Sequence, residues 1–140
     1  MILCDTGPLV AVLNRNDPQH ARCVAVLQKL SAAPLLTTVP CLVEAMYLLR
    51  RVAGAEGQSR LWQMRYEGKL VVHLHTDAEL DRIEALMRQY EDVPMDFADA
   101  SLVVAAESLG LSEIFTLDSH FYAYRISTGE AFIVYPGLGE

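Results

Sequence analysis

Short apolar runs alternate with longer segments of helical periodicity along the whole chain, and this alternation most constrains the fold. The runs predict strands at residues 2–4, 35–39, 70–74, 114–117 and 131–134. Helical spacing or helix-start signals mark residues 9–13, 19–31, 41–52, 60–66, 76–90 and 96–109, with a loop at 54–57. Alternating strands and helices form parallel βαβ units. We therefore predict an α/β/α sandwich of three layers around a mainly parallel five-stranded sheet, as one domain over residues 1–140.

Composition limits the class of protein further. The chain has 140 residues, of which 52% are hydrophobic and 21% charged, which is typical of one globular domain. Its apolar runs are too short to span a membrane, and its three cysteines lack the spacing of a zinc site or disulfide framework. We expect a reduced, cytoplasmic protein without a membrane partner. A net charge of −7 argues against simple nucleic-acid binding, unless the acids gather around metal ions.

Two of the acids directly follow predicted strands. Asp5 comes after the first strand and Asp118 after the fourth. The carboxyl ends of parallel strands form the crevice where α/β proteins bind ligands, so both side chains are expected at one pocket. The alternative is that each aspartate only caps the helix that follows it.

Three further acids lie on predicted helices. Glu44 has apolar neighbours on both sides, which predicts a buried carboxylate that needs a partner, a metal or a proton; the alternative is a position at the edge of that face, in reach of water. Asp96 and Asp99 are three residues apart and share a helix side; the alternative is that Asp96 is only the N-cap and Asp99 only a first-turn acid favoured by the helix dipole. Carboxylates gathered in one pocket repel each other, and a hard divalent cation such as Mg²⁺ or Mn²⁺ removes that penalty.

The order of these acids resembles the PIN domain family of metal-dependent ribonucleases, which includes the VapC-type toxins. The resemblance covers nearly the whole chain and rests on four blocks at residues 5–11, 40–45, 94–103 and 115–121, which contain Asp5, Glu44, Asp99 and Asp118 in turn. It implies a flavodoxin-like topology and Mg²⁺- or Mn²⁺-dependent hydrolysis of single-stranded or loop RNA.

The resemblance also assigns roles to residues. Asp5, Asp99 and Asp118 would bind metal and act in catalysis with Glu44, which would hold a second ion or orient water. Asp96 is an additional acid, and Thr6 and Thr116 would support the site by hydrogen bonds. An RNA substrate, a small antitoxin and a homodimer are the implied partners. A PIN-fold protein that binds RNA or antitoxin without cleavage, or a housekeeping nuclease, is the alternative.

A locally basic segment offers a contact for RNA despite the acidic total. Residues 50–69 carry five basic side chains against Glu56 and Glu67, and we expect RNA contacts from Arg50, Arg51, Arg60 and Arg65. Trp62, Met64 and Tyr66 in the same segment favour core or dimer packing over base stacking. His73 and His75 share a strand face at a spacing that suits a metal, but the sequence indicates no third soft ligand near them.

Overall fold

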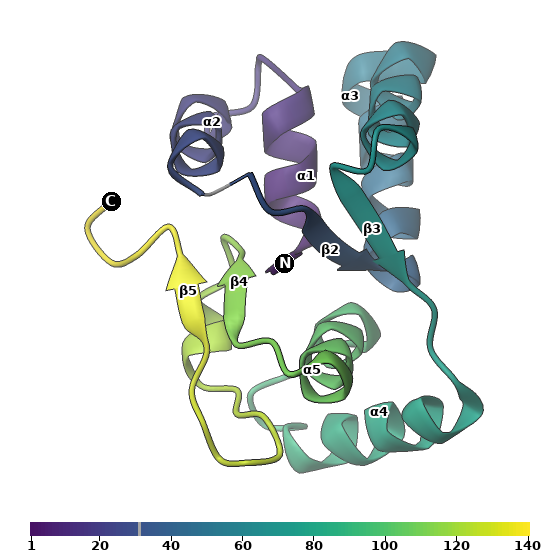
Figure 1. The fold of residues 1–140 in the computed structure, drawn as a ribbon, viewed down its shortest axis with the longest axis vertical. Helices are drawn as coiled ribbons and strands as arrows, with labels where there is room; N and C mark the ends of the chain where they lie inside the picture. The colour runs from purple at the N-terminus through teal and green to yellow at the C-terminus, as the bar shows by residue number, and fades with distance from the viewer. Residues whose placement is uncertain (31) are drawn as a thin grey trace.

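The protein is described by a computed structural model that covers residues 1–30 and 32–140. Within these residues, five strands form one sheet, and all its neighbouring strands are parallel (Figure 1). The strands are β1 (Ile2–Cys4), β2 (Leu35–Thr38), β3 (Leu70–His73), β4 (Glu113–Phe115) and β5 (Ile133–Tyr135), in the spatial order β3-β2-β1-β4-β5. The predicted α/β architecture is confirmed.

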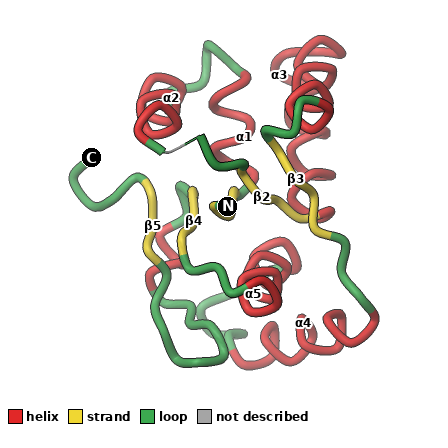
Figure 2. Tube along the Cα trace, viewed as in Figure 1, coloured by secondary structure: helices red, strands yellow, loops and turns green. Residues whose placement is uncertain are grey.

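Helices cover both faces of the sheet (Figures 1 and 2). One face carries α1 (Thr6–Leu13), α2 (His20–Lys29) and α3 (Val39–Tyr66), and the other carries α4 (Asp77–Gln89) and α5 (Phe97–Leu109). A short 3-10 helix, η1 (Ser119–Tyr122), follows β4. Each face has its own apolar core, because the strands are buried between two helical layers. The predicted end of the second helix at residue 31 lies outside the described residues.

The strand order reverses between β1 and β4. The chain builds β1, β2 and β3 towards one edge and then returns to place β4 on the other side of β1. In open parallel sheets, ligands bind beyond the carboxyl ends of the strands at such a reversal. Asp5 follows β1 directly, and its backbone N–H donates to the carbonyl of Phe115 at the end of β4, 2.9 Å away. The topology therefore brings residues 5 and 116–118 together.

The structure corrects two local predictions. The first helix, predicted at residues 9–13, begins earlier, because α1 starts at Thr6 with only Asp5 between it and β1. The loop expected at 54–57 is a bend at Gly54, where φ is 65° and ψ is −162°, and helix resumes on the far side. Leu49 and Leu61 are both fully buried on either side of the bend. Apolar packing on one face therefore keeps the two helical segments together despite the glycine.

No helix among residues 1–30 and 32–140 is long and apolar enough to cross a membrane.

Candidate active site

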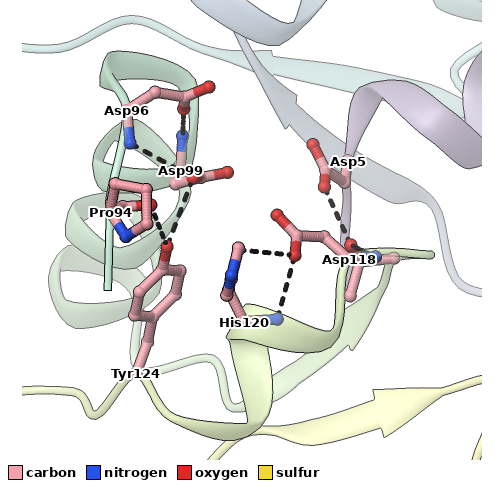
Figure 3. A network of polar contacts seen from close by, with 8 residues as sticks. Asp5, Pro94, Asp96, Asp99, Asp118, His120 and Tyr124 are labelled. Atoms are coloured by element: carbon pink, nitrogen blue, oxygen red, sulfur yellow. Dashed lines mark hydrogen bonds and ion pairs between the residues drawn. The ribbon is translucent and has the colours of Figure 1, made fainter. Parts of the chain in front are cut away.

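Three aspartates from distant parts of the sequence point into one space. Asp5 follows β1, Asp99 lies in the first turn of α5, and Asp118 follows β4 (Figure 3). One carboxylate oxygen from each lies within 4.8 Å of the other two. Their closeness is a consequence of the strand order, which sets the ends of β1 and β4 side by side, next to the first turn of α5.

Asp5 is held rigidly by its neighbours. As the N-cap of α1, its Oδ1 accepts a hydrogen bond from the N–H of Thr6 at 2.7 Å, and its Oδ2 accepts one from the hydroxyl of Thr116 at 2.8 Å. The side chain is buried. Burial raises the pKa of Asp5, and repulsion from Asp118 and Glu44 raises it further. The two hydrogen bonds lower the pKa, but by less than the other causes raise it. Asp5 therefore caps α1 and also belongs to the pocket that it shares with Asp99 and Asp118.

Asp99 and Asp96 form a reciprocal cap at the start of α5. The N–H of Asp99 donates to Asp96 Oδ1 at 2.8 Å, and the N–H of Asp96 donates to Asp99 Oδ2 at 3.2 Å. The buried Tyr124 hydroxyl lies 3.3 Å from the same Oδ2 and 3.1 Å from the carbonyl of Pro94 (Figure 3). Burial, with repulsion from Asp96, Asp5 and Asp118, raises the pKa of Asp99 to about 7. A carboxyl so perturbed would be stabilised in its charged form by a nearby cation.

Asp118 lies between solvent and the pocket. It caps η1, with Oδ1 accepting from the N–H of His120 at 2.9 Å, and the same oxygen is 3.0 Å from His120 Nδ1. Its own N–H donates to the hydroxyl of Thr116 at 3.0 Å. Because that hydroxyl also donates to Asp5, Thr116 connects two of the three acids through one buried oxygen.

The acids have no positive partner that explains their convergence. In the described part of the chain, His120 is the only side chain in an ion pair with any of the three, and no guanidinium or ammonium group reaches them. Oxygen donors alone, two of them buried, match the ligand preference of Mg²⁺ and Mn²⁺. The residues present therefore fit a hard divalent cation.

Glu44 does not occupy the position its local sequence predicts. It is exposed, as are Val43 and Tyr47, whereas its neighbour Ala45 is buried, so Glu44 lies at the edge of the apolar face of α3. Its Oε2 lies 3.4 Å from the hydroxyl of Thr6, next to Asp5. Glu44 thus stands at the rim of the pocket, and the expectation that it is buried is wrong. Asp96 is also exposed, on the opposite rim.

The basic side chains proposed for RNA contacts all lie on the surface of α3. Arg50, Arg51, Arg60 and Arg65 are exposed. Two of them have local partners, since Arg60 forms an ion pair with Glu56 at 2.8 Å and Arg51 lies over the ring of Tyr47. The exposed fractions of Trp62 and Tyr66 are 50% and 86%. Of the two uses favoured from the sequence, core packing is therefore wrong for these rings, and packing in a dimer stays a prediction.

Sequence reasoning overlooked Tyr124 and His120 as neighbours of the acids. Tyr124 is fully buried, and its ring packs edge-on against Phe121. The available signal was the spacing of Phe121 and Tyr124, three residues apart in a segment that begins with a capping aspartate, which predicts one helical turn with a buried aromatic side. Nothing in that spacing shows that the hydroxyl would reach Asp99.

Comparison with known proteins agrees with this architecture. No family model matches the chain. Among curated proteins it is similar to Ribonuclease VapC26 of Mycobacterium tuberculosis, with 28% identity over 137 residues that cover 96% of this chain and all of the relative.

Solved structures of toxins share the fold. VapC20 of Mycobacterium tuberculosis, a toxin that cleaves the sarcin–ricin loop, superposes with a TM-score of 0.80 at 20% identity, covering 88% of this chain and 94% of VapC20. A toxin–antitoxin complex from Klebsiella pneumoniae gives a TM-score of 0.63 at 16% identity, covering 85% and 88% of the two chains.

The fold and the convergent acids define a PIN-like α/β domain. The relatives found are more specific, because they are VapC-type toxins. The chain is similar to VapC26 in sequence along nearly its whole length, and to VapC20 in structure. The resemblance inferred from the four acidic blocks is thereby confirmed.

Proposed function

We propose that this protein is a metal-dependent endoribonuclease and the toxin of a VapBC-type toxin–antitoxin pair, acting on single-stranded or loop RNA in the cytoplasm. The observation that carries the proposal is the convergence of Asp5, Asp99 and Asp118, with which no lysine or arginine of the described residues forms an ion pair. The similarity to a protein named as a ribonuclease supports the same reaction class.

Each residue of the pocket has a distinct task in this proposal. Asp5, Asp99 and Asp118 hold Mg²⁺ or Mn²⁺, which when bound neutralises phosphate charge and lowers the pKa of a water molecule. Thr116 fixes the carboxylate of Asp5, and Thr6 does the same for Glu44 at the rim. Glu44 is free to orient the attacking water or to hold a second ion, because it is exposed on the open side of the pocket.

Substrate binding is assigned to the basic surface of α3. Arg50, Arg51, Arg60 and Arg65 would contact phosphates, and exposed Trp62 and Tyr66 offer faces on which unpaired bases can stack. The pairing of Arg60 with Glu56 is exposed and weak, so it would not prevent a phosphate contact.

Protein partners are supported by an apolar groove beside the acids. Val39, Val43, Leu74, Leu80 and Phe97 line it, and each has an exposed fraction of 39% or more. We propose that the groove joins two copies of the chain in a homodimer and that a small antitoxin binds the assembled toxin. Light scattering of the wild type and of Phe97→Asp tests the first part, with a loss of the dimer expected in the variant.

The experiment that tests the main proposal measures cleavage of a labelled hairpin RNA with and without Mg²⁺. The wild type should cut in the loop and leave a 5′-phosphate, and Asp5→Asn should be inactive with an unchanged circular dichroism spectrum. Glu44→Gln should slow cleavage while retaining affinity for the ion. RNA binding that does not depend on Mg²⁺, with no cleavage by the wild type, would instead favour a binding protein.

A further inference from the structure

A second cluster of side chains that could bind a metal lies where β3 connects to α4. Figure 1 shows the course of the chain from β3 to α4. His73 is the last residue of β3, His75 lies in the connection, and Glu79 is in the first turn of α4. One ligand atom from each lies within 4.8 Å of the other two, and all three side chains are partly buried. The sequence indicated no third soft ligand for the histidine pair, and the structure places the carboxylate of Glu79 beside it.

The hydrogen bonds around His75 leave one ring nitrogen available. Its Nε2 lies 3.0 Å from the carbonyl oxygen of Ser101, which can only accept, so Nε2 carries the hydrogen. In the neutral ring the lone pair is then on Nδ1. A histidine that donates one N–H to a backbone carbonyl and keeps the other nitrogen free is the usual state of a metal ligand.

Glu79 is positioned in a similar way by groups that do not belong to the cluster. The N–H of Thr76 donates to Oε1 at 2.9 Å, and the hydroxyl of Ser108 on α5 donates to Oε2 at 2.8 Å. The same Oε2 lies 2.8 Å from His73 Nε2. The carboxylate is therefore oriented from two helices before any ion is present, which reduces the cost of ordering it on binding.

We propose that His73, His75 and Glu79 bind a divalent transition metal of the Zn²⁺ class, separate from the cation held by the aspartates. Two imidazole nitrogens and one carboxylate oxygen are a donor set that suits zinc, and water completes a tetrahedral shell. Bonds of about 2.0–2.1 Å in a tetrahedron place ligand atoms about 3.3 Å apart. The ion replaces the hydrogen between His73 and Glu79, and these two atoms move apart by about half an ångström.

The donor chemistry keeps the two sites distinct. Mg²⁺ prefers oxygen ligands and retains its waters, so it belongs at the aspartates, whereas imidazole nitrogens favour zinc, cobalt or nickel. An ion at the histidine cluster would join the end of β3 to the start of α4. It would therefore act on stability, and its effect is measurable without RNA.

The test is zinc binding to metal-stripped protein carrying Asp5→Asn and Asp118→Asn, so that the acidic pocket is disabled. Isothermal titration should give one equivalent of Zn²⁺, thermal denaturation should show a rise in Tm, and Co²⁺ should give a visible spectrum typical of tetrahedral coordination. In Glu79→Gln and His75→Gln, affinity should fall at least about tenfold. Both variants retain the structural hydrogen bonds, because glutamine accepts from Thr76 in the first and donates to Ser101 in the second.

His20→Gln is the matched control, because His20 begins α2 outside the cluster and its Nδ1 contacts the carbonyl of Ala11. It should bind zinc like its parent. Zinc affinity that is unchanged in both Glu79→Gln and His75→Gln would place the ion elsewhere, for example at a cysteine, and would overturn the proposal. So would the absence of zinc binding by the parent protein. None of these outcomes depends on nuclease activity, so the result is separable from that of the proposed function.

Discussion

Replacing Asp99 with asparagine should stabilise the metal-free protein at neutral pH. The folded protein raises the pKa of Asp99 from its usual 3.8 to about 7, with burial as the largest cause. At 1.36 kcal/mol per pKa unit, this difference corresponds to about 4 kcal/mol of destabilisation once the group is ionised. Asparagine has nearly the same shape and carries no charge, so it avoids this cost.

Hydrogen bonding reduces the expected gain. The carboxylate of Asp99 accepts from the N–H of Asp96 and from the hydroxyl of Tyr124, and neutral acceptors make weaker bonds. A loss of about 1 kcal/mol for each bond leaves a net stabilisation of about 2 kcal/mol. For a chain of this size, that raises Tm by about 6 °C.

The pH dependence distinguishes this explanation from a packing effect. Because the folded state holds the proton on Asp99 more tightly, the wild type loses stability as pH rises from about 4 to about 7. Asparagine does not titrate, so the advantage of Asp99→Asn should be full at pH 7.5 and largely absent at pH 4. Urea denaturation with chelator at the two pH values measures it. Asp96→Asn preserves the N-cap and should show part of the same gain, because it removes one source of the repulsion on Asp99. A variant that is less stable than wild type at both pH values would refute the electrostatic argument.

Two further predictions concern Tyr124 and Gly54. Tyr124→Phe should lower the free energy of unfolding by about 1 kcal/mol and weaken Mn²⁺ binding, because Asp99 and the carbonyl of Pro94 lose the hydroxyl that they share. Tyr122 is nearby and more exposed, so Tyr122→Phe is the control and should change neither the urea midpoint nor the Mn²⁺ affinity. Gly54→Ala should cost about 2 kcal/mol in urea denaturation, since φ is +65° there and an added Cβ meets nothing within 4 Å, so backbone strain is the whole effect. An unchanged midpoint for Gly54→Ala would show that the bend relaxes without the glycine.

The sequence predicted the layers of the fold because strand and helix periodicities are local signals. Asp5 and Asp118 were predicted to share a pocket because each directly follows a predicted strand, and the structure brings their carboxylates together. The two helices predicted on either side of residues 54–57 correspond to the two helical segments of α3, which are joined by a kink at Gly54 alone and not by a four-residue loop.

The remaining differences arise from long-range contacts. Glu44 was predicted to be buried because its neighbours are apolar, but only some of them, such as Ala45, face the core, while Val43 and Tyr47 share the exposed side of α3 with Glu44. Glu79 forms a capping box with Thr76 at the start of α4. Its contact with His73 depends on the path of residues 74–76 between β3 and α4, which no local pattern records.

The most direct test of the central claim is Mn²⁺ binding to the aspartates, measured by electron paramagnetic resonance in the absence of RNA. The wild type should bind Mn²⁺ with competition from Mg²⁺, and Asp5→Asn and Asp118→Asn should each weaken binding at least about tenfold while Glu79→Gln leaves it unchanged. Equal Mn²⁺ affinity in the wild type and in both aspartate variants would contradict the account, because the three carboxylates would then be helix caps and not a metal site.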